Sequence, residues 1–168
     1  MSARIVDDKF KKNKLQYFVQ SMLAGCAVVA ALFFFDVVTR PIIIASFGAS
    51  AFIVFTRPHQ KIASLRNVLG GYIAGIIVGM IIHYIIIIPA VENEFTVRVM
   101  YIISGGIAVF SAMFLMSIFD IEHAPAASIA LGLVLNNWDA KTIIYILIGI
   151  TIVSCIKQFT KRYMIDLS

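Results

Sequence analysis

The chain has 168 residues, of which 61% are hydrophobic and only 14% are charged, and its mean hydropathy is +0.95. A soluble domain averages about 45–50% apolar and about 25% charged residues. A soluble chain this short could not bury so much apolar surface, because most of its residues would lie near the exterior. The composition therefore excludes a soluble enzyme, a nucleic-acid-binding protein and a disordered chain, and it predicts a protein that lies in a lipid bilayer.

Charge and motif content exclude further classes. The formal net charge is +5, but the basic side chains gather at the chain ends and in one loop, which is typical of membrane orientation and leaves no basic face for a nucleic acid. The sequence has no Cys or His cluster at metal-ligand spacing, no glycine-rich phosphate loop and no nucleophile paired with a base. We therefore expect no catalytic activity, no cofactor and no nucleic-acid partner.

Six apolar segments follow a polar head at 1–14. A helix of about 20 residues crosses the roughly 30 Å hydrocarbon core, and four segments are predicted to be such spans. The other two segments are short, and each follows a polar break that ends in a proline. In chain order the long spans are 15–35, 68–88, 99–119 and 142–156, the short segments are 42–55 and 126–135, and the breaks are 36–41 and 120–125.

The two breaks reveal an internal repeat. The string FDVVTRP at 35–41 and the string FDIEHAP at 119–125 share Phe, Asp and Pro at an offset of 84 residues, which is half of the chain. A long span precedes each break, and a short segment and another span follow it. We predict a single membrane domain over 1–168, built from two homologous halves at 15–88 and 99–156.

The placement of charge predicts six crossings. The N-terminus, the 56–67 region and the C-terminal tail are basic, whereas the loop at 89–98 is acidic. All three basic regions face the cytoplasm only if the two short segments also cross the membrane, as the positive-inside rule favours. We therefore expect a multi-pass protein of the cell inner (plasma) membrane with cytoplasmic termini. The fold class is all-α and polytopic, with two inverted repeats, each of two long transmembrane helices and one short broken helix.

The breaks predict an anion site. A helix of 14 residues spans only about 21 Å, so each break must dip into the membrane. Proline fits the first turn of a helix, and Pro41 and Pro125 therefore mark the starts of two short helices. We expect the N-termini of these helices to approach each other near the midplane, where their partial positive charge and free N–H groups attract anions. Arg40 and His123 lie beside them.

Other polar residues complete the predicted site. Ser46 and Ser50 are four residues apart and share one helix face, so their hydroxyls could line a path, although small residues also serve close helix packing. The candidate anion ligands are Arg40, Thr39, Ser46, Ser50, His123 and Ser128, and the structural or coupling residues are Asp36, Asp120, Pro41, Pro125 and Asn67.

Each charged candidate has a second interpretation. Arg40 is either an anion ligand or an interfacial arginine that reaches the lipid headgroups. His123 is either a group that protonates as an anion arrives or a structural hydrogen-bond partner of the break. Asp36 and Asp120 are expected to cap the short helices or to pair with Arg40 and His123, and the alternative is a proton-coupling carboxylate.

Glycines in the second span predict a helix contact. Gly71, Gly75 and Gly79 repeat every four residues and therefore lie on one face of the helix. Such overlapping G-x-x-x-G motifs let two helices approach closely in a membrane. The partner helix is expected either within the same chain or in a second copy of it.

Several strings resemble the HPP family of integral membrane proteins over most of the chain, from Leu15 to Ile156. They are Ser46-Phe-Gly-Ala-Ser-Ala51, Arg57-Pro-His59, Arg66-Asn-Val-Leu-Gly-Gly71 and His123-Ala-Pro-Ala-Ala-Ser128. The His-Pro-Pro motif that names the family is altered here to His123-Ala124-Pro125. The family is usually described as having four transmembrane helices. Its chloroplast and cyanobacterial members are associated with nitrite transport, and the resemblance implies a similar role.

We therefore expect the protein to transport a small monovalent anion, nitrite first, through the site between the two short helices. A membrane anchor or ligand sensor and a passive anion channel are the alternatives. The expected partners are the lipid bilayer, the anion and further copies of the chain, because six short crossings enclose little volume and favour a homodimer or a higher oligomer.

Overall fold

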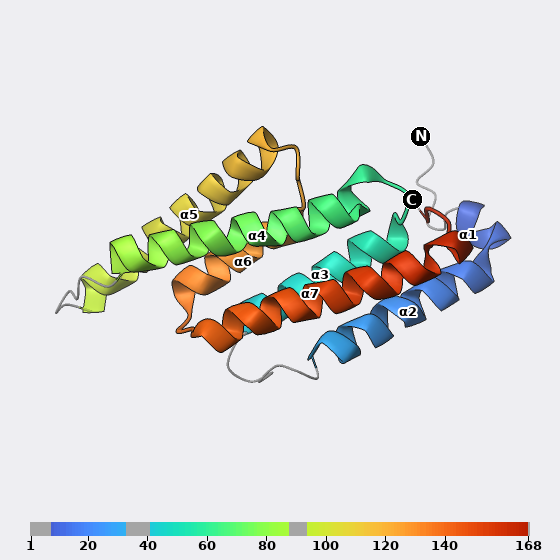
Figure 1. Cartoon of the computed structure of the whole chain (residues 1–168), viewed down its shortest axis with the longest axis horizontal. Helices are drawn as coiled ribbons and strands as arrows, with labels where there is room; N and C mark the ends of the chain where they lie inside the picture. Colours follow the sequence, from blue (N-terminus) through green and yellow to red (C-terminus); the bar gives the residue numbers. More distant parts are fainter. Residues whose placement is uncertain (1–7, 33–40, 88–93, 168) are drawn as a thin grey trace.

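The computed structural model describes residues 8–32, 41–87 and 94–167, and the regular secondary structure within these ranges is helical (Figure 1). Each of the two short apolar helices lies between two long helices along the chain, which confirms the predicted all-α class. The elements are α1 (Asp8–Lys12), α2 (Lys14–Leu32), α3 (Pro41–Thr56), the 3-10 helix η1 (Lys61–Ala63), α4 (Leu65–Ile82), the π-helix η2 (His83–Ile87), α5 (Glu94–Ile118), α6 (Ala124–Leu135), α7 (Ala140–Thr160) and the 3-10 helix η3 (Lys161–Tyr163).

Helix length separates the transmembrane candidates into two groups. Among the described residues, four helices are long and apolar enough to cross a membrane, namely α2, α4, α5 and α7. The helices α3 and α6 are apolar but shorter. This division confirms the prediction of four long spans and two short segments in a multi-pass membrane protein.

Local capping sets where two of the long helices begin. Ser64 precedes α4, and its hydroxyl oxygen accepts a hydrogen bond from the backbone N–H of Asn67. Asp139 precedes α7 and forms a capping box with Thr142. These side chains satisfy N–H groups that the first turn of a helix leaves without a partner.

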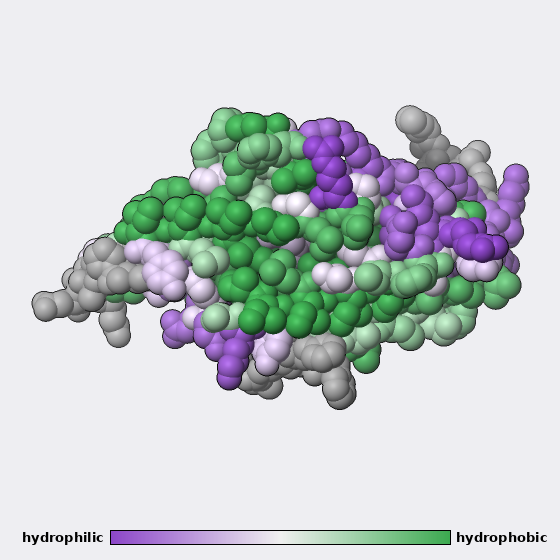
Figure 2. All heavy atoms as spheres, viewed as in Figure 1, coloured by the Kyte–Doolittle hydropathy of each residue, from purple (hydrophilic) through white to green (hydrophobic). Residues whose placement is uncertain are grey.

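The six long and short helices alternate in direction along the bundle (Figure 1). The start of α2 and the described C-terminal segment meet at one end of it, where the hydroxyl of Tyr17 donates to the carbonyl of Leu167 and the N–H of Leu167 donates to the carbonyl of Thr56. Figure 2 shows hydrophilic residues gathered at this end and hydrophobic residues over the middle of the molecule. We refer to this end, formed by the start of α2, residues 57–66 and residues 161–167, as the basic end.

The helices of the two halves pack in the same pattern. In the first half α2 packs on α3, and in the second half α5 packs on α6. Across the halves α2 packs on α7, α5 on α4, α3 on α6 and α4 on α7. The helices that correspond in sequence run in opposite directions, as expected of two inverted halves (Figure 1).

The glycine stripe of α4 is a helix contact within the chain. A Cβ atom at Gly75 would lie 2.4 Å from the carbonyl oxygen of Ala126, and one at Gly79 would lie 2.9 Å from the Cβ of Leu133. The backbones of α4 and α6 therefore touch along this stripe, because only glycine leaves room for the approach. Of the two partners that the sequence allowed, the structure selects α6 of the same chain.

Candidate functional site

The N-terminus of α6 lies inside the bundle. His123 precedes the helix in an extended conformation, and Pro125 occupies the first turn. A Cβ atom at Gly71 would lie 2.9 Å from the Cβ of His123, so the two residues are level with each other. Gly71 is six residues beyond Leu65, and the start of α6 therefore lies about 9 Å deeper than the start of α4. The break before α6 therefore leads into the bundle, and its predicted entry into the membrane stays a prediction.

A chain of buried polar side chains continues from this point. The ring of His123 contacts the carbonyl oxygen of Ile62 through Nδ1 at 3.1 Å and the hydroxyl of Ser50 through Nε2 at 2.9 Å. Ser50 lies 2.8 Å from the hydroxyl of Tyr72, which donates to Ser46 at 3.3 Å. All four side chains are at most 1% exposed. The chain links α6, α3 and α4 through an otherwise apolar core.

The direction of these hydrogen bonds follows from their ends. A carbonyl oxygen can only accept, so His123 Nδ1 must carry a hydrogen for Ile62, and Ser46 must donate to the carbonyl of Ile43 at 2.7 Å. In the neutral ring Nε2 then accepts from Ser50, so the hydroxyl oxygen of Ser50 in turn accepts the one hydrogen of Tyr72, which the more distant Ser46 can only share. This tautomer is assigned from the hydrogen bonds. Both ring nitrogens are thus engaged within the protein. His123 fixes the start of α6 against α3 and η1, which is the structural role that the sequence left open.

A cavity of about 300 Å³ opens beside the start of α6. The carboxylate of Glu122 accepts a hydrogen bond from Ser117 there at 3.1 Å. An anion in this cavity would face the positive end of the α6 dipole and the carboxylate of Glu122 together. The lining residues are Met113, Met116, Ser117, Glu122, His123, Ala124 and Ala127.

The two short helices do not bring their N-termini together, and the predicted site between them is wrong in this respect. The C-terminal half of α6 lies beside the start of α3, because a Cβ atom at Gly132 would contact Ile43 at 3.0 Å. The start of α6 lies beside Ser50 instead. The helices are antiparallel neighbours, and about nine residues of α3, or about 14 Å, separate their N-termini.

Asp120 neither caps α6 nor pairs with His123, in contrast to the prediction. It ends α5 in a left-handed conformation with φ 53°, and the N–H of Ile121 donates to the carbonyl of Met116 as in a Schellman motif. Its carboxylate pairs with Lys61, and both side chains are 61% exposed. The hydrogen bond and the positive charge of Lys61 hold the pKa of Asp120 below its ordinary value.

The remaining predicted residues divide between several places. Pro41 begins α3, as expected. Ser128 is half-buried in α6, and within the described part of the chain no hydrogen bond joins it to the His123 chain. Asn67 is 3% exposed, and its amide donates to the carbonyl of Glu122, so it ties the start of α4 to the break. The predicted candidates Asp36, Thr39 and Arg40 lie outside the described residues.

Several buried polar residues, among them Tyr72, Gln20 and Lys157, were missed by the sequence reasoning. Tyr72 joins Ser46 to Ser50. Gln20 donates to the carbonyl oxygens of Phe55 in α3 and of Ile165 in the C-terminal tail. Lys157 is 3% exposed and donates to the carbonyl of Ala63. Each lies in or directly beside an apolar segment, and a polar side chain in that position was the signal that could have identified it.

Comparison with known proteins gives one match. The family model described as HPP, transmembrane region, matches residues 10–164. No curated protein matches the chain, and no solved structure does. The match covers all six long and short helices together with the polar chain and the cavity. The chain therefore belongs to the HPP transmembrane family, and this membership indicates a membrane transport or channel role.

Proposed function

We propose that the protein transports a small monovalent anion, nitrite first, past the start of α6. The observation that carries the proposal is the position of this helix start. It lies inside the bundle of a membrane protein, borders a cavity of about 300 Å³ and is held by the buried chain of His123. The partial positive charge of a helix N-terminus attracts an anion in a low-dielectric setting.

His123 acts here as a positioning residue. Its ring joins η1 on one side to α3 on the other, so that the start of α6 keeps its place beside the cavity. Loss of the ring would release both contacts and leave Ser50 and the Ile62 carbonyl without this partner. We expect His123→Ala to lower uptake by shifting α6.

Glu122 opposes anion entry in the proposed transport. Its carboxylate lines the same cavity and would repel an anion there. Glu122→Gln removes this charge and should raise nitrite uptake.

The proposal includes the orientation and the assembly. The three basic regions lie at one end of the bundle, and the positive-inside rule places such an end in the cytoplasm. We propose a plasma-membrane location with both termini cytoplasmic. We also propose that further copies of the chain join it, because one bundle of this size encloses little volume.

Uptake into proteoliposomes tests the function. The purified protein would be supplied with nitrite, formate or nitrate, with and without an inward proton gradient, and compared with empty vesicles. We expect saturable nitrite uptake above that of empty vesicles, and acceleration by the gradient would indicate proton coupling. His59→Gln is the matched control for His123→Ala, since His59 lies in the loop at the same end of the bundle.

Three outcomes separate the alternatives. Flux that follows only the anion gradient and the voltage would indicate a passive channel. An inert protein with all three anions, although folded, would contradict transport and favour an anchor or sensor. Equal loss of uptake in His59→Gln and His123→Ala would remove the specific role of the α6 start.

A further inference from the structure

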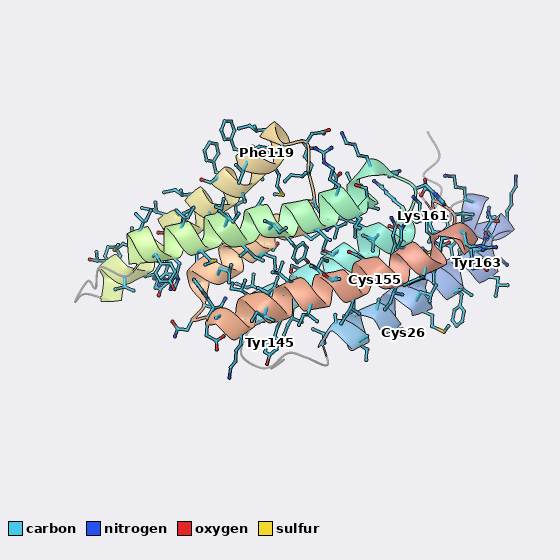
Figure 3. The ribbon with its side chains drawn as sticks, viewed as in Figure 1. Cys26, Phe119, Tyr145, Cys155, Lys161 and Tyr163 are labelled. Carbon is cyan, nitrogen blue, oxygen red and sulfur yellow. The ribbon has the colours of Figure 1, made fainter. Side chains whose placement is uncertain are left out.

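Lys157 is a buried cation with few partners. It lies on α7 between Cys155 and Lys161, which Figure 3 labels, and only 3% of it is exposed. Its ammonium donates to the carbonyl oxygen of Ala63 at 2.7 Å. An ammonium has three N–H donors, so two remain after this bond.

No carboxylate forms an ion pair with Lys157 within the described structure. No Asp or Glu oxygen there lies within ion-pair distance of its Nζ atom, and Asp166 acts on its charge only from further away. Asp166 itself accepts a hydrogen bond from the backbone N–H of His59 at 3.0 Å. A buried cation without a directly paired carboxylate is unfavourable in a membrane protein, and such residues typically mark an ion pathway.

A second polar group without a partner lies on the same face of α7. Ser154 is 4% exposed, and within the described structure its hydroxyl oxygen makes no hydrogen bond. It precedes Lys157 by three residues, which places both side chains on one face of the helix. The two residues line the same small pocket together with Val54, Ala63, Leu65 and Gln158, and this pocket has no room for a water molecule while η1 lies in place.

The pocket is closed by η1. The carbonyl oxygen of Ala63 accepts from Lys157, and the preceding carbonyl, that of Ile62, accepts from His123. Adjacent backbone oxygens of this short segment are therefore held by α7 and by the start of α6. The Ala63 oxygen occupies the position in front of the ammonium that an anion would take.

We propose that Lys157 and Ser154 form an anion-binding site, which a small monovalent anion enters when η1 withdraws the Ala63 carbonyl. The proposal rests on the proposed anion transport and adds a second anion-binding site at the basic end of the same path. One ammonium and one hydroxyl match a single negative charge with few acceptor atoms, such as nitrite or bromide. A divalent oxyanion such as sulfate is too large and too highly charged for this pair.

Anion-dependent thermal unfolding of the purified full chain tests the site. Nitrite and bromide should raise the melting temperature of the wild-type protein, and sulfate at equal ionic strength should not. Lys157→Met should weaken the apparent nitrite affinity at least roughly tenfold, because a charge-assisted hydrogen bond and the counter-charge are lost. Ser154→Ala should weaken it less.

Lys161→Met is the matched control, because it makes the same change four residues further along the chain, at the start of η3 and outside the pocket. It should retain the nitrite-dependent shift. Equal behaviour of the two methionine variants, or a wild-type protein without any anion-dependent shift, would overturn the site. Lys157→Arg keeps the charge and shows whether a lost shift reflects binding or impaired folding, since it should restore part of the affinity.

The proposed binding site and the proposed transport can be contradicted separately. An anion-dependent shift that requires Lys157, in a protein without uptake, would leave the site in place and contradict transport. Uptake and binding that are unchanged in Lys157→Met would leave transport in place and contradict the site. Bromide located by its anomalous scattering beside Nζ in a crystal would support the site directly, and bromide found elsewhere would contradict it.

Discussion

The short helices α6 and α3 each pack beside a long helix, yet the two interfaces differ. Between α4 and α6 the glycines have no spare room, and a Cβ atom at Gly75 would lie 2.4 Å from the oxygen of Ala126. Between α2 and α3 a Cβ atom at Gly25 or Gly48 would meet nothing within 4 Å. Both of these glycines line a groove of about 390 Å³ between α2 and α3.

The difference shows what close packing makes possible in a membrane. The buried chain from His123 to Ser46 runs beside the tight interface, where Tyr72 follows the first glycine of the stripe. Helix backbones that touch leave no space for lipid between them. The buried polar atoms beside such an interface therefore keep their hydrogen bonds to one another. The loose interface keeps a groove lined mainly by small and apolar side chains, and its one buried polar contact noted above, from Gln20 of α2 to the carbonyl of Phe55 in α3, lies at the basic end of the groove.

Replacing Gly75 should lower the stability most, because Gly75 lies at the closest approach of α4 and α6. In Gly75→Ala the new methyl group meets the backbone of α6, which cannot rotate away as a side chain can. Overpacking of this kind costs about 1–3 kcal/mol or more. The loss should appear as a lower melting temperature of the purified protein in detergent.

Gly48→Ala is the control for this contrast. The site is open and helical, so alanine should be neutral or stabilise the protein by up to about 1 kcal/mol through helix propensity. Equal destabilisation by Gly75→Ala and Gly48→Ala would mean that the two interfaces do not differ in the way described.

Removing the hydroxyl of Tyr72 should have an intermediate effect. Tyr72→Phe keeps the ring but deletes the link between Ser50 and Ser46, and one lost buried hydrogen bond costs about 1–3 kcal/mol when its partner stays unsatisfied. The thermal unfolding of Tyr72→Phe is best compared with that of Tyr84→Phe, whose ring is 54% exposed. Similar melting temperatures for the two variants would show that the buried hydrogen bonds of Tyr72 do not stabilise the protein.

Removing the ion pair of Asp120 with Lys61 should change the stability least. The pKa of Asp120 is lowered in the folded protein, so its contribution is present above the unfolded pKa and is lost as pH falls through the folded one. The pair is exposed, and Asp120→Asn should change stability only slightly at neutral pH and should remove this acid-dependent part. Melting curves between about pH 3 and pH 7 measure it, and an unchanged acid dependence in the variant would contradict this assignment.

The repeated motif correctly predicted where the short helices begin, but it did not correctly predict which side chains contact each other. Pro41 and Pro125 stand in the first turns of the short helices, as expected from the fixed φ of proline. The same motif suggested that Asp120 would cap α6, but the residue ends α5 instead. A local string shows where a helix can start, whereas the pairing of a carboxylate depends on which chain segment folds over it, here η1 with Lys61.

The sequence by itself determined that this is an all-α, multi-pass membrane protein with four long and two short apolar helices, because hydrophobic length, proline and charge placement act locally along the chain. It also identified Ser46, Ser50 and His123 as polar residues of interest. The tertiary structure alone decided that these residues meet through Tyr72, that α3 and α6 run side by side in opposite directions, and that Lys157 faces η1. Such contacts depend on helix rotation and depth, which packing of the whole bundle fixes.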